Sequence, residues 1–514
     1  MNGRIAQAFA LLPDYLAWHV LLSASALLLG LAISVPLAVV AARNARLRWP
    51  VLAFAGLIQT IPSLALLALF YPLLLGLSAA SEALFGKGFS ALGFLPSLLA
   101  LTLYSMLPIL RTTTTGILGV DPAIREAADG VGMTPRQRLF QVELPLAMPV
   151  IMAGVRTAAV WTIGAATLST PVGQTSLGNY IFAGLQIENW VFVLFGCAAS
   201  AILAMTVDQL LGLIETGASR RSRMRVVAGL ALLTIGVLAA IAPLAAIGKP
   251  AAYVVGAKNF SEQYILAELM AERLERAGAH VSRKEDLGSA VAYRALAAGE
   301  IDVYVDYTGT LWTNVLGRSD NPGREAVLSE LTSELKRRDG VLVLGSLGFE
   351  NAYAFAMRSD RARELGITSL ADLAREAPRL NLGSDLEFLS RPEWKAVDEA
   401  YDLRFRSERS FQPTFMYRAL AGGEADVISA FSSDGRIAAD KLVVLTDPKG
   451  ALPPYDAVIL VSPKRAEDQR LLSALRPLVG SVSVEAMRAA NYSVDRDRDK
   501  ATPAQAAGAL LNQR

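Results

Sequence analysis

The chain has 514 residues, of which 53% are hydrophobic and 19% charged, with a formal net charge of +2. This length predicts more than one domain, the small net charge gives no reason to expect a nucleic-acid partner, and a single cysteine excludes an intrachain disulfide. Long apolar runs dominate residues 1–250, whereas residues 251–514 have the composition of a soluble domain. The two halves are therefore expected to meet different solvents.

Six apolar segments in the first half approach or exceed the roughly 20 residues that a helix needs to cross a bilayer. They are residues 19–41, 52–77, 93–110, 147–168, 190–214 and 226–247. The first segment is too long for a signal-peptide core and is followed by arginines, so we interpret it as a retained span. The pattern predicts an all-α membrane domain over residues 19–247, preceded by an extracytoplasmic segment, 1–18.

Arginines mark one side of this membrane domain. The loops after the first, third and fifth spans carry Arg43, Arg46, Arg48, Arg111, Arg125, Arg136, Arg138, Arg220, Arg221, Arg223 and Arg225. Cytoplasmic loops are enriched in Lys and Arg, so these loops are expected to face the cytoplasm. The sixth span then exits outward. We therefore expect a multi-pass protein of the plasma (inner) membrane whose C-terminal half is extracytoplasmic.

The loop between the third and fourth spans carries a spaced motif. Glu126-Ala127-Ala128 is followed after three residues by Gly132 and, after nine more, by Val142-x-Leu144-Pro145. Asp121 and Pro122 predict the start of a helix, Gly132 a break, and Pro145 the end of a second helix. The motif resembles the coupling loop of bacterial ABC importer permeases, with Val142 in place of isoleucine. The resemblance implies that residues 121–145 dock on an ATPase subunit through Glu126, Ala127, Ala128, Gly132, Leu144 and Pro145.

The chain has no Walker A motif, so we expect ATP on a separate cytoplasmic subunit, and no cofactor or metal on this chain. Six spans are half of what an importer core of this type uses, and the resemblance therefore implies a homodimer. Asp208 is the one ionisable residue that stands out within the spans. We interpret it as an interfacial cap or as a partner of the arginines that follow it, which argues against a proton-coupled carrier.

After a short tether, residues 248–252, strands and helices alternate over residues 253–514. This alternation predicts an α/β domain with parallel-type sheets, two lobes around a cleft, and ligand-binding loops at the carboxyl ends of the strands. Because five residues reach at most about 18 Å, the domain is expected to stay at the mouth of the membrane domain.

Five stretches of this half carry a recognisable pattern: residues 256–266, 298–310, 348–353, 417–435 and 453–456. They resemble the binding proteins for glycine betaine, choline and carnitine. With the coupling loop, the resemblance covers nearly the whole chain. It implies a type I ABC importer permease fused to a periplasmic-binding-protein-like domain, in the osmoprotectant-uptake family.

A quaternary ammonium has no N–H to donate, so aromatic ring faces must hold it, while N–H and O–H donors hold the other end of a zwitterion. The aromatic candidates are Tyr307, Phe431, Tyr353, Tyr417, Tyr293 and Phe388. The candidates for the polar end are Lys258, Asn259, Thr308 and Arg391, while Asp306 and Asp434 orient the rings or meet the cation. The family often has tyrosine at Phe431 and an aromatic or histidine near Leu386. A related betaine such as ergothioneine therefore stays open as the solute.

Two other classes of protein are considered. A ligand-gated channel or receptor also joins a two-lobed domain to membrane spans, but the sequence contains no pore loop and no cytoplasmic effector domain. A membrane enzyme is disfavoured, because the second half has no nucleophile elbow, zinc-ligand spacing or P-loop.

Overall fold

The structure is a computed structural model that describes residues 2–86, 89–186, 189–246, 253–318, 320–385, 387–411, 413–496 and 499–512. Its residues separate into two units, one of residues 1–184 and 190–249 and the other of residues 185–189 and 250–514. The predicted tether, 248–252, lies outside the described residues.

The first unit is entirely helical. Its helices are α1 (Asn2–Arg43), α2 (Ala45–Thr60), α3 (Ser63–Phe85), α4 (Phe94–Leu118), α5 (Pro122–Gly130), α6 (Pro135–Arg138), α7 (Leu144–Ala166), α8 (Gly178–Gln186), α9 (Trp190–Ser219) and α10 (Arg223–Ala246). Among the described residues, six helical stretches are long and apolar enough to cross a membrane, which confirms the predicted six-span domain: Ile5–Arg43, Ser63–Phe85, Phe94–Leu118, Pro135–Val172, Trp190–Ser219 and Arg223–Leu244.

One of the expected spans has wrong boundaries. The predicted second span, 52–77, is broken at Ile61, whose extended backbone (ψ 126°) precedes Pro62 and separates α2 from α3. Helix α1 runs from Asn2 to Arg43, through both the predicted extracytoplasmic segment, 1–18, and the first predicted span. At 1.5 Å per residue this helix is about 63 Å long, twice the hydrocarbon thickness of a bilayer, so part of it must lie beyond the membrane.

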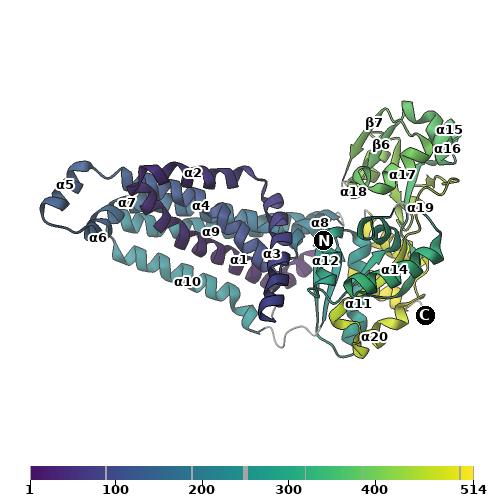
Figure 1. Ribbon diagram of the computed structural model, residues 1–514, viewed down its shortest axis with the longest axis horizontal. Coiled ribbons are helices and arrows are strands. Elements are labelled where there is room, and N and C mark those ends of the chain that lie inside the picture. Colours follow the sequence, from purple (N-terminus) through teal and green to yellow (C-terminus); the bar gives the residue numbers. More distant parts are fainter. Residues whose placement is uncertain are drawn as a thin grey trace. The chain divides into compact units, whose positions relative to one another are not determined.

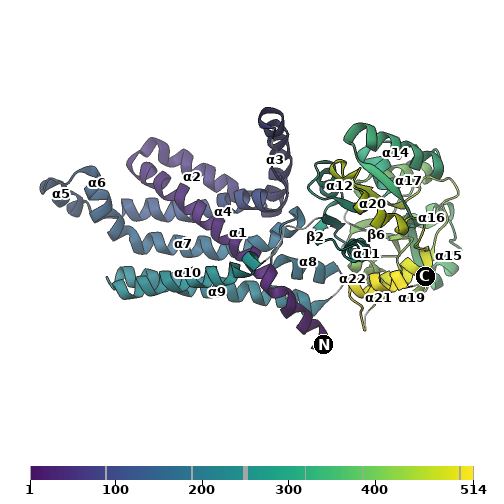
Figure 2. The same cartoon turned by 90° about the horizontal axis from the view of Figure 1, so that it is seen from below.

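Helices α1, α4, α7, α9 and α10 run side by side (Figures 1 and 2). Helix α4 is the most buried of them and packs on both α1 and α7. Gly154 of α7 makes one close approach possible, since a Cβ there would lie 2.8 Å from Thr112 Cβ and 2.9 Å from the Pro108 carbonyl oxygen. Helices in a membrane gain no hydrophobic free energy by packing together, so their association depends on close van der Waals contact. Small residues allow the two helix backbones to approach closely enough for this contact.

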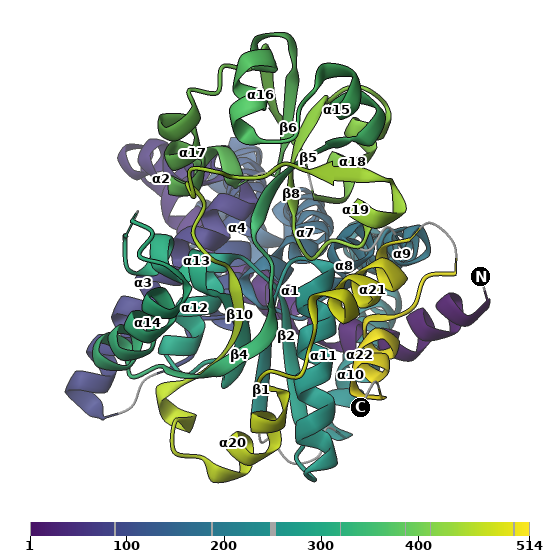
Figure 3. The same ribbon diagram turned by 90° about the vertical axis from the view of Figure 1, so that its right-hand side faces the viewer.

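The second unit contains two mixed sheets. Its strands are β1 (Tyr253–Lys258), β2 (Val281–Leu287), β3 (Val303–Tyr307), β4 (Leu342–Glu350), β5 (Tyr353–Arg358), β6 (Asn381–Ser384), β7 (Ser407–Ser410), β8 (Val427–Phe431), β9 (Leu442–Val444) and β10 (Asp456–Val461). The strand orders are β2-β1-β3-β10-β4 and β7-β6-β8-β5-β9. We call the regions built on these sheets the first and second lobes; Figure 3 shows them one above the other.

Helices cover the faces of these sheets. They are α11 (Ser261–Arg276), α12 (Ser289–Ala297), α13 (Thr308–Thr310), α14 (Arg324–Asp339), α15 (Ser359–Leu365), α16 (Leu370–Glu376), α17 (Pro392–Tyr401), α18 (Pro413–Ala421), α19 (Arg436–Ala439), α20 (Gln469–Leu475), α21 (Val484–Asp495) and α22 (Pro503–Asn512). The chain enters the second lobe between β4 and β5 and returns between β9 and β10. Because of these crossings, β10 and β5 run antiparallel to their neighbours, whereas the sequence predicted parallel-type sheets.

The approach of α7 to α4 makes a testable prediction. Gly154→Ala inserts a methyl group against Pro108 and Thr112, and overpacking of this kind costs about 1–3 kcal/mol. We expect a lower apparent melting temperature of the full chain in detergent. Gly164 lies on the same helix with nothing within 4 Å of its added Cβ, so Gly164→Ala is the matched control and should leave the melting temperature unchanged or raise it. Equal effects of the two substitutions would contradict the proposed packing.

Candidate functional site

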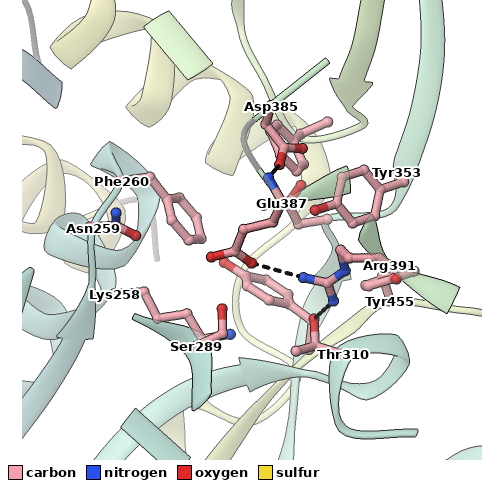
Figure 4. Close-up of a pocket in the computed structure, with 13 residues that line it drawn as sticks. Lys258, Asn259, Phe260, Ser289, Thr310, Tyr353, Asp385, Glu387, Arg391 and Tyr455 are labelled. Carbon is pink, nitrogen blue, oxygen red and sulfur yellow. Dashed lines mark hydrogen bonds and ion pairs between the residues drawn. The ribbon is translucent and has the colours of Figure 1, made fainter. Parts of the chain in front are cut away.

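A cavity of about 120 Å³ lies between the two lobes of the second unit. Its lining residues are Lys258, Asn259, Phe260, Ser289, Tyr307, Thr310, Asn351, Tyr353, Asp385, Glu387, Arg391, Phe431 and Tyr455. Figure 4 shows Lys258 and Phe260 on one side of it, and Tyr353 and Arg391 on the other. Most lining residues follow the carboxyl ends of strands, where loops gather in open α/β sheets.

A buried ion pair fixes the wall of the first lobe. Lys258 ends β1 and its ammonium contacts the carboxylate of Asp306 on the neighbouring β3. Both side chains are almost fully buried, and Asp306 also accepts hydrogen bonds from the Tyr304 hydroxyl (2.6 Å) and the Tyr307 backbone N–H (2.8 Å). A buried charge needs such compensation. Asp306 therefore holds Lys258 in place without lining the cavity itself.

The ring of Tyr307 lines the cavity, and its hydroxyl is held by hydrogen bonds to buried side chains. The hydroxyl donates to Glu262 Oε1 (2.6 Å) and accepts from Gln263 Nε2 (3.0 Å). The ring stacks against Phe260 with centroids 6.2 Å apart, and the Lys258 Nζ atom lies 5.4 Å from its centroid. Burial, followed by the neighbouring Glu262 charge, raises the pKa of Tyr307 well above its ordinary value. The ring is therefore neutral and held in one orientation.

Glu262 joins elements that are far apart in the sequence. Its carboxylate also accepts from Asn351 Nδ2 (3.0 Å), at the crossing between the lobes, and from Asn491 Nδ2 (2.7 Å), on α21. Asn491 in turn donates to the Ser433 carbonyl of the second lobe (3.0 Å). Burial raises the pKa of Glu262, although its hydrogen bonds oppose the shift. The network ties the Tyr307 ring to the connection between the lobes.

The second lobe contributes a cluster of aromatic rings. Tyr353 on β5 lies 4.7 Å from the centroid of Phe388, 5.1 Å from Phe431 and 5.7 Å from Tyr455. Phe431 ends β8 and pairs with Tyr353 in the antiparallel register. Phe388 is completely buried behind Tyr353 and does not line the cavity. Five lining rings, Phe260, Tyr307, Tyr353, Phe431 and Tyr455, thus face the cavity from both lobes.

Arg391 is held by a buried carboxylate. Its Nε and Nη2 atoms donate to Glu393 Oε1 at 3.1 and 3.0 Å, Nη1 donates to Glu387 (3.2 Å), and Nη2 reaches Thr310 of the first lobe (3.3 Å). Glu393 also accepts from the Tyr455 hydroxyl and from Thr313 (3.1 Å), both of the first lobe. Burial acts to raise the pKa of Glu393, but the Arg391 charge and these hydrogen bonds lower it overall.

Asp385 brings a second carboxylate to the cavity. Its Oδ1 accepts from the backbone N–H groups of Glu387 (2.8 Å) and Phe388 (3.0 Å), whereas its buried Oδ2 accepts no hydrogen bond from the described residues. Burial raises the pKa of this carboxyl, and the two backbone hydrogen bonds oppose the shift. An unpartnered buried oxygen carries a desolvation cost that a ligand with an N–H group would relieve.

Six of the residues proposed from the sequence line the cavity together: Lys258, Asn259, Tyr307, Tyr353, Arg391 and Phe431. The others lie elsewhere. The Thr308 hydroxyl bridges the Pro454 carbonyl and the Asp456 N–H, and the Tyr293 hydroxyl donates to Asp339 (2.6 Å); neither residue is part of the cavity lining. Tyr417 and Asp434 line a neighbouring cavity of about 80 Å³. Leu386 lies outside the described residues.

Seven lining residues were not among those proposed: Phe260, Ser289, Thr310, Asn351, Asp385, Glu387 and Tyr455. Four of them, Phe260, Thr310, Asn351 and Tyr455, stand inside the stretches that carried the family resemblance. Position within those stretches was therefore a usable signal for them. Ser289, Asp385 and Glu387 stand in no such stretch, and only the folded chain places them at the cavity.

The coupling loop forms a compact turn of helices. Asp121 caps α5 through Ala123 N–H (2.9 Å), and Gly132 adopts a left-handed φ of +82° between α5 and α6. Arg138 joins Asp129 (2.7 Å) and approaches Glu143 (3.3 Å), which closes the loop. The expected end at Pro145 is wrong, because the helical path continues through one π turn, Leu139–Glu143, into α7. Pro145 has no N–H to donate to the preceding turn, and the π turn directly before it is the local departure from regular α-helix.

The proposed docking residues differ in exposure. Glu126, Ala127, Gly132 and Pro145 are exposed, Leu144 is half-buried, and Ala128 is buried. Three apolar side chains of the same loop also face solvent in this chain: Ile124, Val131 and Phe140. Apolar side chains in such number on a short polar loop are typical of a contact surface.

Comparison with known proteins agrees with both units. Residues 34–220 match the family described as "Binding-protein-dependent transport system inner membrane component", and residues 251–513 match "Substrate binding domain of ABC-type glycine betaine transport system". The chain belongs to these ABC importer families, as a permease fused to a substrate-binding domain. This confirms the resemblance and the fold class predicted from the sequence, and it makes the chain a transport subunit rather than an enzyme.

Named relatives share this organisation in whole or in part. The chain is 30% identical to the "Ergothioneine transport permease/ergothioneine binding protein EgtU" of Helicobacter pylori over 91% of this chain and 84% of that one. It is 41% identical to the "Choline transport system permease protein OpuBB" of Bacillus subtilis over 38% of this chain and 83% of that one. A solved structure titled "Crystal structure of glycine betaine/carnitine/choline ABC transporter" is 27% identical, with a TM-score of 0.45 over 50% of this chain and 97% of that one.

The buried ion pair of Arg391 predicts a pH-dependent stability. Glu393→Gln removes one partner of a buried pair, which typically costs about 3–5 kcal/mol, and should lower the melting temperature of the full chain at pH 7. The lowered pKa of Glu393 means that this stabilisation is present above its ordinary pKa of 4.5 and is lost as pH falls through the folded-state value. The deficit of Glu393→Gln should therefore shrink below about pH 4.5.

The control for this experiment is Glu387→Gln. Glu387 also contacts Arg391, but its side chain is 51% exposed, so its removal should cost about 1 kcal/mol or less. If Glu393→Gln were no more destabilising than Glu387→Gln at pH 7, Glu393 would not anchor Arg391.

Proposed function

We propose that the chain is the permease and capture domain of an ATP-driven importer for small solutes with a methylated quaternary ammonium, such as glycine betaine, choline or carnitine. The observation that supports this most strongly is the cavity between the lobes, where five aromatic rings surround a space bordered by acidic and basic side chains. The match of residues 251–513 to a glycine betaine-type binding domain points to the same class of solute.

The chemistry of the cavity suits such a solute. Methylated ammonium groups bind to ring faces by electrostatic attraction and dispersion, at about 6 Å or less from the centroid. Asp385 and Glu387 add negative charge beside the rings. Lys258 uses one of its three N–H bonds on Asp306, and Arg391 lies at the opposite wall, so both have donors for a carboxylate or hydroxyl at the other end of the solute.

The permease is proposed to work with a separate ATPase and as a homodimer. The coupling loop, residues 121–145, presents exposed Glu126, Ala127 and Gly132, with Ile124 and Val131 as apolar contacts for the ATPase. In the proposed cycle the solute closes the lobes, the closed domain docks on the extracytoplasmic mouth, and ATP binding acts through the coupling loops to open the path. ATP stays on the partner, and this chain needs no cofactor of its own.

A related betaine with a ring N–H, such as ergothioneine, is the second candidate solute. Asp385 favours it, because the Oδ2 atom of Asp385 is buried without a hydrogen-bond donor among the described residues. Glycine betaine has neither an N–H nor an O–H to donate to that oxygen, whereas an imidazole-type ring has an N–H. The relative from Helicobacter pylori, named as an ergothioneine transporter, extends over most of the chain and supports the same alternative.

Titration of the purified full chain in detergent with glycine betaine, choline, carnitine and ergothioneine tests the proposed class of solute. We expect saturable binding of at least one of them, and a loss of about tenfold or more in affinity for Tyr307→Ala, which removes a ring face. Tyr307→Phe keeps the ring and should retain most of the affinity, and Tyr293→Phe, at a residue outside the cavity lining, should equal the parent. Binding of none of the four solutes would refute the proposal.

Asp385→Asn separates the two candidates. Asparagine can still accept the backbone N–H groups of Glu387 and Phe388, but it lacks the carboxylate charge. If the natural solute carries a ring N–H, affinity for ergothioneine should fall about tenfold, as expected for a lost charge-assisted hydrogen bond, and affinity for glycine betaine much less. Glu387→Gln is the matched control, because it removes a negative charge from the same cavity and leaves Asp385 intact. Equal losses for both solutes would count against a specific contact to Asp385.

A further inference from the structure

Helices α7 and α9 of the permease share an ionic cluster. Arg156 on α7 donates to Asp208 of α9 through Nε (2.8 Å) and Nη2 (2.7 Å), and to Glu215 of α9 through Nη1 (2.7 Å). The sequence drew attention to Asp208 alone, as a cap or as a partner of the arginines after it. Its partner is instead Arg156, in the preceding span.

Within this cluster Arg156 lies far from both ends of its helix, whereas Glu215 lies four residues before the end of α9. Arg156 is twelve residues from the start of α7 and ten from its end, or about 18 and 15 Å along the helix. Ionisable groups at such depth are costly in lipid, and they almost always face a water-filled cavity or the interior of a bundle. The cluster has two carboxylates for one guanidinium, so its formal charge is −1 when all three groups are ionised.

A cavity of about 420 Å³ opens beside the cluster. It is lined by Ala153, Arg156, Thr157, Val160, Trp161 and Asp208. The side chains of Arg156 and Asp208 are 32% and 24% exposed, and Trp161 is 55% exposed. A face that combines exposed charges with an aromatic ring is a poor surface for lipid. We therefore interpret this face as part of a water-filled path through the membrane unit.

Both ends of a zwitterion find partners here. The guanidinium has five N–H bonds, of which three are used on Asp208 and Glu215; among the described residues this leaves one on each terminal nitrogen for a carboxylate. The Trp161 ring, the best aromatic partner for a cation, borders the same cavity as the Asp208 carboxylate.

We propose that this cavity is a transit site, at which the permease itself binds the solute during translocation. The methylated ammonium lies against Trp161 near Asp208, and the carboxylate meets the remaining N–H groups of Arg156. The proposal rests on the proposed function, because it takes the class of solute from the cavity between the lobes. It adds a binding site in the membrane unit to the one in the cavity between the lobes.

The test uses the full chain with its ATPase partner in proteoliposomes and radiolabelled glycine betaine. Trp161→Leu keeps an apolar side chain but removes the ring, and should lower ATP-driven uptake about tenfold. Its affinity for glycine betaine at the capture domain, measured on the same preparation, should equal that of the parent. Trp161→Phe keeps a ring and should retain most of the uptake. Trp190→Leu, an exposed tryptophan at the start of α9 outside the cavity, is the matched control.

The outcomes separate this proposal from the proposed function. Parental uptake by Trp161→Leu would overturn the transit site, and so would equal losses in Trp161→Leu and Trp161→Phe, which would point to packing alone. Either result, with solute affinity retained, leaves the proposed function standing. If the parent chain bound none of glycine betaine, choline, carnitine and ergothioneine, the proposed solute class would be refuted, and the transit site with it.

Discussion

A single buried carboxylate, that of Glu393, organises the cavity between the lobes. It comes from the second lobe, where it holds Arg391, and it accepts hydrogen bonds from Tyr455 and Thr313 of the first. Because a buried charge is tolerated only when it is paired and hydrogen-bonded, these contacts to Oε1 join the two lobes at this point, while Oε2 accepts no hydrogen bond from the described residues. The guanidinium of Arg391, the ring of Tyr455 and, through contact with it, the ring of Tyr353 then have little freedom.

In the wall formed by the first lobe, buried carboxylates also hold the side chains that line the cavity. Asp306 fixes Lys258, and Glu262 fixes the hydroxyl of Tyr307 and connects it to Asn351 and Asn491. Lys258, Tyr307 and Arg391 are thus each oriented by a buried acid that does not line the cavity. Such support lets ring faces and N–H donors point at a solute without first being ordered by it, which lowers the cost of binding. In the membrane unit, Asp208 and Glu215 orient Arg156 in a similar way, although Asp208 also lines the neighbouring cavity.

Much of this architecture was predictable, because it rests on local signals. Hydropathy located the six spans, and the spacing around Gly132 located the coupling loop. The break at Ile61 was not predicted, although Pro62 carries the signal, because the apolar run continues through it. Residues within the family-like stretches led to Tyr307, Tyr353 and Phe431, which do line the cavity.

Contacts between side chains that are distant in the sequence could not be predicted from the sequence. Arg156 was overlooked because its partners lie 52 and 59 residues away on another helix, and a single arginine in an apolar run has no spacing to mark it. Phe388 and Tyr293 were proposed as cage residues by type, but one is buried behind Tyr353 and the other donates to Asp339. Asp385 could not be recognised from the sequence, because its proposed role depends on its buried Oδ2 atom, which has no hydrogen-bond donor among the described residues.

The most direct test of the central claim is a structure of the full chain determined with glycine betaine and, separately, with ergothioneine. The account predicts density for the trimethylammonium group between the lobes, within about 6 Å of the ring centroids of Tyr307, Tyr353 or Phe431. The carboxylate should then lie within hydrogen-bond distance of Arg391 or Lys258. Solute bound elsewhere on the capture domain, or with its ammonium away from every ring, would contradict the account.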